Sequence, residues 1–451
     1  MKRFRPYLSY DPVARIRAGR AFACAGALGL LTAGCALDET SDSQLADDVL
    51  ITSERARAEP GLSDEALEEQ VAANTALAFD LFHLLRAELE ADDNLAFSPY
   101  SISSALAMTH AGARGETADE IAEALRFSLP DDGHHAACNA LDQALAERPG
   151  EVEDDDALKL SVANALWAQE DSPIEESFLD VLAEHYGSGM RVLDFANDPE
   201  RSREIINAWV SDRTEETIPE LLPPPAITPY TRFVLTNAIY LKADWLFPFE
   251  KEQTREQPFS LPGGETVEVE RMHQIARLPY AAKDDYQAVV MPYEGESLSM
   301  AFVVPDEGRF DDVQASLGAD VLAEVYAGVE LAEVDLGLPK FELVSESDLM
   351  PPFEELGMVA AFDPDVSDFS GIDGGFDPRL HITDILHEAF VAVDEEGTEA
   401  GAATGVVGGT DSIPQVDVTL HIDRPFFFFL VDEPTQTLLF LGRVLDPRGE
   451  D

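Results

Sequence analysis

The order in which helical and strand-like patterns follow one another constrains the fold of this chain more than any other feature. Early in the chain, apolar residues recur at helical spacing, first in Val71, Leu77, Phe79, Leu81, Phe82, Leu84 and Leu85, and then in Ile102, Leu106 and Met108. Runs rich in β-branched and aromatic residues come later, at residues 158–167, 231–241, 287–292, 298–304, 331–343, 388–394, 416–422 and 426–431. Helices first and strands later indicate an α+β fold.

The charge balance limits the partners that this chain can have. The sequence has 88 acidic and 30 basic residues, a formal net charge of −58. Such a surface repels nucleic acid and anionic membranes, so neither is expected as a partner. The acidic surface either serves solubility or reflects adaptation to high salt, which would screen its self-repulsion.

The first 34 residues read as a secretory leader. Arg15, Arg17 and Arg20 precede an apolar run at residues 21–31, which is too short to span a bilayer but suits a signal sequence. Residues 35–62 are rich in Asp, Glu, Ser and Ala and lack apolar periodicity, so we expect a flexible acidic tether there. The folded domain is then expected at residues 63–451.

The leader ends in Leu31-Thr32-Ala33-Gly34-Cys35, which resembles the cleavage and lipidation box of bacterial lipoproteins. The resemblance implies that Cys35 carries a lipid, with Ala36 favouring sorting to the outer membrane. We therefore expect a protein secreted across the inner membrane and lipid-anchored at the outer membrane, on its periplasmic or cell-surface face. Thr32 stands where Leu is preferred, so ordinary secretion to the extracellular space is the alternative. Apart from this anchor no membrane contact is expected.

Three segments of the body resemble the serpin family of protease inhibitors. Residues 420–430 (LHIDRPFFFFL) are similar to the serpin signature near the C-terminus, residues 94–102 (NLAFSPYSI) to the start of the second helix, and residues 235–245 (LTNAIYLKADW) to the central strand of the largest sheet. Shorter matches extend the resemblance from about residue 71 to the end of the chain, at residues 338–341, 348–349, 356–358 and 440–444. The resemblance implies an α+β serpin fold with three β-sheets, about nine helices and an exposed reactive-centre loop.

The segment at residues 394–414 joins two strand-like runs and has few large side chains. By itself it is a linker or, because it is long for a compact domain, a functional loop. The resemblance identifies it as the reactive-centre loop, whose insertion into a sheet is a form of strand addition. Its hinge would comprise Gly397, Thr398, Glu399, Ala400, Gly401, Ala402, Ala403 and Thr404.

The side chains at alternate positions of this segment are compatible with its insertion into a sheet as a strand. In a strand, Thr398, Ala400, Ala402, Thr404 and Val406 would face the helices beneath the sheet, and all are small or apolar. Glu399 falls on the opposite, solvent-facing parity, where a charge costs little. No proline interrupts residues 397–413, so no ladder hydrogen bond is removed. Gly401 replaces the Ala usual in inhibitory relatives, a mild departure that would slow insertion.

Counting from Gly397 by the spacing usual in inhibitory serpins places the reactive bond between Asp411 and Ser412. Asp at this position favours a protease whose pocket presents Arg, because a guanidinium pairs bidentately with a carboxylate. Thr410 and Val407 are the alternative positions and suit elastase-like or subtilisin-like pockets. The expected partner is a serine protease, or alternatively a cysteine protease, and the inhibitor is expected to be a monomer.

The resemblance implies a suicide-substrate inhibitor that traps its protease as an acyl-enzyme. The alternatives are a non-inhibitory serpin that acts as a surface binding protein, and a plain protease substrate.

The resemblance also implies which residues control the opening of the sheet. Their positions match a polar cluster at the sheet centre, which would consist of Ser98, Ser101, Asn237 and His387. Trp245, Lys340 and Glu395 match the region where insertion begins, and Lys340 and Glu395 would hold the base of the loop.

Catalytic chemistry finds no support in the sequence. There is no nucleophile elbow, phosphate loop or zinc helix, so no catalytic residue, enzyme activity or cofactor is expected. His134, His135 and Cys138 have helical spacing, but an exposed helix with a solitary thiol is favoured over a metal site. Asp363, Asp365 and Asp368 lack the spacing of a calcium loop. With Cys24 in the leader and Cys35 in the lipidation box at its end, Cys138 stands alone and no disulfide is expected.

Overall fold

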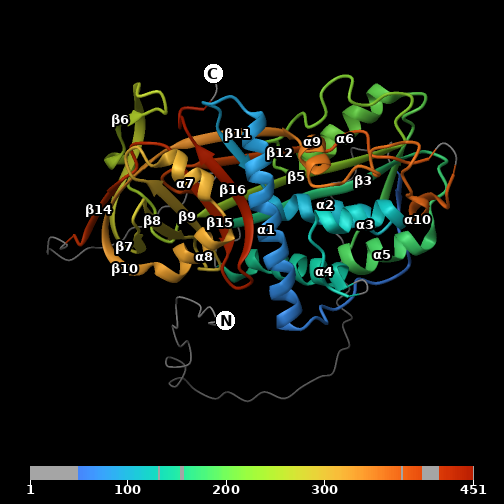
Figure 1. Ribbon diagram of the computed structural model, residues 1–451, viewed down its shortest axis with the longest axis horizontal. Helices are drawn as coiled ribbons and strands as arrows, with labels where there is room; N and C mark the ends of the chain where they lie inside the picture. The colour runs from blue at the N-terminus through green and yellow to red at the C-terminus, as the bar shows by residue number, and fades with distance from the viewer. Residues whose placement is uncertain (1–48, 131–132, 153–156, 377–378, 399–415, 450–451) are drawn as a thin grey trace, which may run out of the picture. The chain divides into compact units, whose positions relative to one another are not determined.

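The computed structural model describes residues 49–130, 133–152, 157–376, 379–398 and 416–449. The described residues belong to one unit, which is folded from helices packed on two sheets (Figure 1). Among them no helix is long and apolar enough to cross a membrane.

The two long helices predicted first along the chain are confirmed. α1 (Asp64–Glu88) begins at Ser63, whose side chain accepts a hydrogen bond from the Ala66 amide, and its acidic first turn suits the positive end of the helix dipole. α2 (Pro99–His110) begins at Ser98, with Pro99 in the first turn, where its missing N–H costs nothing. Both helices bury their apolar stripes in the core.

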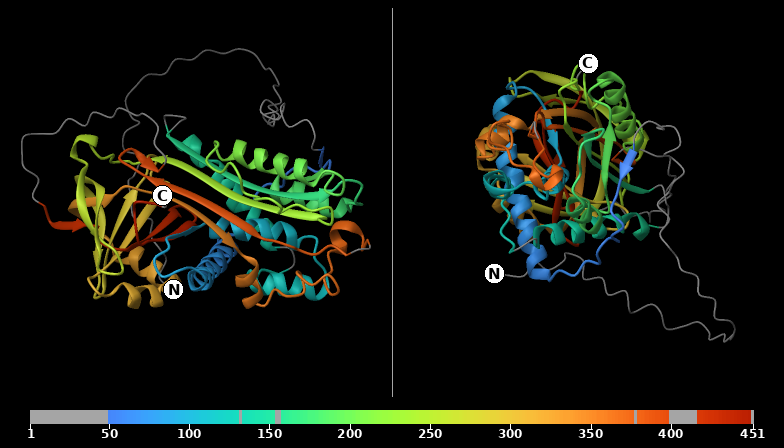
Figure 2. Two further views of the ribbon diagram at one scale, coloured as in Figure 1. Left: turned by 90° about the horizontal axis from the view of Figure 1, so that it is seen from above. Right: turned by 90° about the vertical axis from the view of Figure 1, so that its right-hand side faces the viewer.

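The remaining helices are shorter, which makes ten α-helices among the described residues where about nine were expected. They are α3 (Gly115–Ala124), α4 (Gly133–Ala146), α5 (Glu176–Tyr186), α6 (Pro199–Arg213), α7 (Phe310–Ser316), α8 (Ala319–Gly328), α9 (Met350–Glu355) and α10 (Ser370–Asp373). In the left view of Figure 2, α6 lies on one face of a long sheet, and α1 and α2 lie on the other.

That long sheet has seven strands and positions the candidate site. Its order is β1 (Val49–Ile51), β4 (Met190–Leu193), β3 (Leu158–Gln169), β5 (Phe233–Asp244), β13 (Gly397–Thr398), β12 (Leu386–Val393) and β11 (Phe341–Asp348). β3 and β5 pair antiparallel along their whole length, whereas β5 and β12 run parallel.

The second sheet has nine strands. Its order is β14 (Val418–His421), β10 (Glu330–Pro339), β7 (Thr266–Ala282), β8 (Tyr286–Pro292), β9 (Leu298–Pro305), β15 (Phe426–Asp432), β16 (Thr437–Val444) and β2 (Leu95–Phe97), with β6 (Arg255–Ser260) paired to β7. The predicted fold class is confirmed, but these strands join into one sheet where the family resemblance implied two. The reason is the long strand β7, which pairs with β10 and, at its end, also with β8.

Two boundaries differ from the predictions. The run at residues 331–343 is not one strand: it divides at Lys340 into β10 and β11, which belong to different sheets. Residues 49–51 fall within the flexible tether predicted at residues 35–62, but they form β1, which pairs with β4. Further along, Arg57 donates to Asn139 Oδ1 at 2.9 Å, so residues 49–57 are bound to the body.

Candidate functional site

The seven-stranded sheet divides at the end of β5. Nearer the start of β5, β5 and β12 pair directly, from Leu386 opposite Thr236 to Ala389 opposite Ile239. Toward the end of β5 the two strands separate, and β13 lies between them, antiparallel to both. The sheet therefore has a fork whose open end is occupied by the first two residues of the predicted hinge.

Gly397 enters this fork because it has no side chain. It lies opposite Asp244 on β5, and a Cβ at this position would fall 2.0 Å from the Ala243 carbonyl oxygen and 2.8 Å from the Asp244 Cα. No larger residue fits without moving the strand, so glycine is required by close approach of the backbones.

Thr398 follows with its side chain directed into the interior and is only 2% exposed. Its hydroxyl lies 2.5 Å from the Tyr293 hydroxyl, and Tyr293 stacks on Trp245 at a ring distance of 4.3 Å. The inward parity agrees with the alternation in the sequence. At this end of the sheet, however, the interior is filled by the second sheet rather than by helices: Leu430 and Phe440 line the gap beside Thr398.

The turn before the hinge is held by backbone and side-chain contacts. Trp245 donates from its indole nitrogen to the Asp394 carbonyl at 3.1 Å and from its amide to the Glu396 carbonyl at 2.8 Å. Lys340 Nζ lies 3.0 Å from a carboxylate oxygen of Glu395, and Thr254 donates to the other at 2.6 Å. Glu396 pairs with Lys251 at 2.6 Å.

Glu395 is held as a carboxylate although it is only 4% exposed. Burial opposes its ionisation, but the hydrogen bonds from Thr254 and Lys340 outweigh burial and lower its pKa below the usual value. The structure thus brings Trp245, Lys340 and Glu395 together around the hinge turn, as their positions in the sequence implied. Thr254 and Tyr293 were not anticipated, because their contacts depend on distant segments.

The polar cluster lies lower down, where β5 and β12 pair. His387 Nε2 accepts from the Ser98 amide at 3.0 Å, and His387 Nδ1 lies 2.5 Å from Asn237 Oδ1. Asn237 also donates to the Ser101 hydroxyl at 2.9 Å. The four positions named from the sequence are therefore in one connected network that joins β5, β12 and the start of α2.

Asn164 on β3 is a fifth member that sequence reasoning missed. Its Oδ1 accepts from Asn237 at 2.8 Å and from the Ser101 hydroxyl at 3.1 Å. A polar amide in the middle of an apolar strand was the available signal, because such a side chain needs buried partners. Burial lowers the pKa of His387 to about 3, so the network is electrically neutral at physiological pH.

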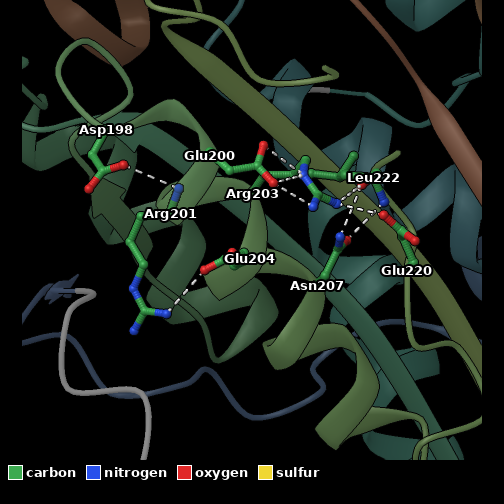
Figure 3. Close-up of polar contacts among 8 residues, drawn as sticks. All are labelled: Asp198, Glu200, Arg201, Arg203, Glu204, Asn207, Glu220 and Leu222. Carbon is green, nitrogen blue, oxygen red and sulfur yellow. Dashed lines mark hydrogen bonds and ion pairs between the residues drawn. The ribbon is translucent and has the colours of Figure 1, made fainter. Parts of the chain in front are cut away.

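On the opposite face, α6 covers the sheet over β3 and β5. Trp209 of α6 packs edge-on against Trp167 of β3 at a ring distance of 5.5 Å. Figure 3 shows how the segment after the helix is tied back: Arg203 pairs with Glu220 at 2.7 Å, and Asn207 both donates to the Leu222 carbonyl and accepts from its amide.

The helix that carries His134, His135 and Cys138 is not exposed as predicted. All three side chains are buried, at 4%, 3% and 6% exposure. His134 Nε2 lies 3.1 Å from His110 Nδ1, and His135 Nδ1 lies 2.6 Å from the Tyr186 hydroxyl. The apolar face of α4 packs on α2 and α5, which carries these residues inside.

The rest of the candidate loop falls outside the described residues. This applies to the hinge positions Glu399, Ala400, Gly401, Ala402, Ala403 and Thr404, to the alternative positions Val407 and Thr410, and to the proposed reactive bond between Asp411 and Ser412. It also applies to Cys35.

Comparison with known proteins assigns the fork and its loop to a family. The family model for Serpin (serine protease inhibitor) matches residues 72–447. An uncharacterized serpin-like protein of Thermococcus kodakarensis is 36% identical over 381 residues, covering 84% of this chain and 86% of the relative. The leukocyte elastase inhibitor of the horse, Equus caballus, is 36% identical, covering 84% of this chain and all of the relative.

A solved structure agrees with these sequence matches. The native state of tengpin, a thermophilic serpin, superposes with a TM-score of 0.76 at 26% identity, covering 89% of this chain and all of that one. The matched region contains the forked sheet, the polar cluster and both strands that flank the loop. The chain belongs to the serpin family of serine protease inhibitors.

Proposed function

We propose that this chain is a suicide-substrate inhibitor of serine-type endopeptidases. The observation that carries the proposal is the fork between β5 and β12, in which Gly397 and Thr398 already lie as the start of a further strand. The rest of the loop would continue this strand from Thr398, between β5 and β12, and would separate the residues of these two strands that now pair directly.

The chemistry begins with an ordinary proteolytic step. The hydroxyl of the protease attacks the Asp411 carbonyl carbon, the peptide bond to Ser412 breaks, and Ser412 leaves as a free amine that carries the transferred proton. An ester between Asp411 and the protease remains. Cleavage frees the loop from its C-terminal attachment, so residues after Thr398 can continue the strand into the fork.

Insertion then moves the protease. From Gly397 to Asp411 an extended strand spans roughly 45 Å, at about 3.3 Å per residue, so the bound protease would be carried along the length of the sheet. The inward side chains of the loop would meet the interior row that contains Leu241 and Asn237, and the residues at those loop positions, which are small or apolar, fit there. Distortion of the protease before deacylation makes the trap permanent.

A protease panel tests the proposal. The purified domain would be incubated with Asp/Glu-directed, elastase-like and subtilisin-like serine proteases, analysed by denaturing electrophoresis, and the released peptide weighed. We expect a covalent band that resists boiling and a peptide that begins at Ser412. A peptide that begins after Val407 or Thr410 would move the reactive bond. Cleavage by every protease without a covalent band would contradict inhibition and favour a plain substrate.

We also propose that Cys35 is the lipidated N-terminus of the mature protein. The support is the apolar run at residues 21–31 followed by Ala33-Gly34-Cys35. Expression of the full chain in a bacterium with two membranes, fed labelled palmitate, should label the wild type at the outer membrane and leave Cys35→Ala unlabelled. Unlabelled wild-type protein in the medium would instead indicate ordinary secretion.

A further inference from the structure

Three neighbouring strands of the nine-stranded sheet place two histidines on either side of a glycine. His273 on β7 and His421 on β14 both lie opposite Gly337 on β10. Because Gly337 has no side chain, the two rings can lean toward each other above it. A Cβ at Gly337 would come within 3.1 Å of the His421 ring, so only glycine leaves this space open.

Asp335 completes the group from the same face of β10. It precedes Gly337 by two residues, which puts its side chain on the same face of the sheet. One of its carboxylate oxygens, Oδ1, lies 2.8 Å from His273 Nε2 and 3.4 Å from His421 Nε2. Two imidazole nitrogens therefore converge on one carboxylate oxygen.

Gln253 determines which nitrogen of His273 carries its proton. Gln253 donates from its amide nitrogen to Glu250 at 2.6 Å, which fixes the amide orientation. The amide oxygen then lies 3.1 Å from His273 Nδ1 and must accept a proton from it. A neutral His273 accordingly presents the lone pair of Nε2 to the Asp335 carboxylate.

Two acceptors that face each other at 2.8 Å repel unless a cation lies between them. A second proton on the imidazole is one such cation, but a proton bridges only one nitrogen to the carboxylate oxygen, whereas two nitrogens converge there. A divalent metal ion is the other. In a tetrahedral zinc site with ligand distances of about 2.0 Å, ligand atoms are separated by about 3.3 Å. The spacings of 2.8 and 3.4 Å in the structure lie on either side of that value.

We propose that His273, Asp335 and His421 bind a divalent transition-metal ion of the zinc type. Two imidazoles and one carboxylate supply three ligands, and water supplies the fourth. Gln253 orients His273 through its other nitrogen, as outer partners of metal-bound histidines commonly do. The side chains are 37%, 24% and 41% exposed, so an ion reaches them from solvent. The strongly acidic surface raises the local cation concentration.

Metal binding would fix the strand that follows the loop. Among the described residues β14 pairs only with β10, at the end of the nine-stranded sheet. An ion held by β7, β10 and β14 together adds a second attachment for β14. The inference needs only the fold and the three ligands, so it stands or fails separately from the proposed inhibition.

Cobalt and zinc titrations of the full folded domain test the site. We expect Co²⁺ to produce visible absorption bands at pH 7.5, and Zn²⁺ to displace it. At zinc concentrations 100-fold above the dissociation constant, the melting temperature should rise by about 3 °C. Asp335→Asn and His421→Gln should each abolish the bands and the thermal shift. Gln253→Ala should weaken cobalt binding by about 10-fold without abolishing it.

The matched control is His381→Gln, which removes another histidine away from these strands and should leave both readouts unchanged. Cobalt bands that persist in His421→Gln would place the metal elsewhere, for instance at His110, His134 and His135, and would overturn the proposal. The absence of any zinc effect in the wild type would overturn it as well.

Discussion

At the scale of single residues, His387 shows how the centre of the forked sheet is held. Its Nε2 accepts from the Ser98 amide, so in the neutral ring Nδ1 carries the proton and donates to Asn237. Burial imposes a desolvation cost on the doubly protonated, charged ring. This is why the pKa of His387 falls to about 3.

His387 should make the folded protein less stable as the pH falls. Because its folded pKa lies below the unfolded value of 6.5, the unfolded chain takes up the proton first. The contribution of His387 is complete above pH 6.5 and is lost as the pH falls toward 3. Denaturant unfolding of wild type and His387→Gln between pH 7 and 4 measures it, with His381→Gln as the control. As the pH falls, the free energy of unfolding of the wild type should decrease by up to about 1.4 kcal/mol per pH unit more than that of His387→Gln. Equal slopes would mean that His387 has the same pKa in the folded and unfolded protein, which would contradict this prediction.

Glu388, next to His387, should make stability depend on pH in the opposite direction, because its pKa is raised in the folded protein. It is 5% exposed and lies opposite Glu346 across β12 and β11, and burial together with that like charge raises its pKa to about 7. Its contribution is complete below pH 4.5 and is lost as the pH rises toward 7.

Glu388→Gln should therefore be more stable than wild type at pH 8, by roughly 2–3 kcal/mol, and equally stable at pH 4. Denaturant midpoints at the two pH values test this. Glu342→Gln, on the same strand as Glu346 but opposite the neutral Ala392, is the control and should change neither midpoint much. A Glu388→Gln variant that is less stable at pH 8 would mean that interactions in the folded protein favour the charged carboxylate, contrary to this prediction.

At the scale of elements, the turn between β12 and β13 leads directly into the first two residues of the hinge. Lys340 occupies the point where the chain passes from β10 in one sheet to β11 in the other, and from there it reaches Glu395. The contact therefore couples the boundary between the sheets to the base of the loop.

Lys340→Met should loosen this turn, because it leaves the buried Glu395 carboxylate with only Thr254 as a side-chain partner. The expected loss is about 1–3 kcal/mol in unfolding free energy. Limited proteolysis should also cut near residues 394–398 faster than in wild type. Lys340→Arg, which retains the charge, should resemble wild type. If Lys340→Met matched wild type in both measurements, the pair would have no part in holding the hinge.

The elements that could be predicted from the sequence are those whose pattern is local. α1, β5, β12 and β15 have helical or strand periodicity that no partner needs to complete. β1 was missed because three residues, Val49 to Ile51, carry no such signal without β4, which lies far along the chain. The division at Lys340 was missed for the same kind of reason, since both halves are strands and only their sheets differ.

The site divides in the same way. His387, Asn237 and Lys340 could be named because the family resemblance placed them, whereas Asn164 and Tyr293 depend on contacts between distant segments. The burial of His134 and His135 was predicted wrongly, because two adjacent polar residues at the start of a helix resemble a solvated end. Their ring contacts with His110 and Tyr186 make that end part of the core.

At the scale of the whole molecule, the proposed inhibition requires the seven-stranded sheet to accept one more strand. The antiparallel register of β13 with both neighbours sets the direction of that strand, and Thr398 sets which side chains face inward. Thr398 is only 2% exposed, so Thr398→Arg would bury a charge at a cost of several kcal/mol. The substitution should stop insertion at its first step.

The most direct measurement is the melting temperature of the chain before and after its loop is cut by a protease that is not trapped. Insertion adds a central strand with hydrogen bonds on both sides, so the cut wild type should melt at a clearly higher temperature than the intact protein. Cut Thr398→Arg should not. If the cut and intact wild-type proteins melt at the same temperature, the loop does not enter the fork and the proposed mechanism is wrong.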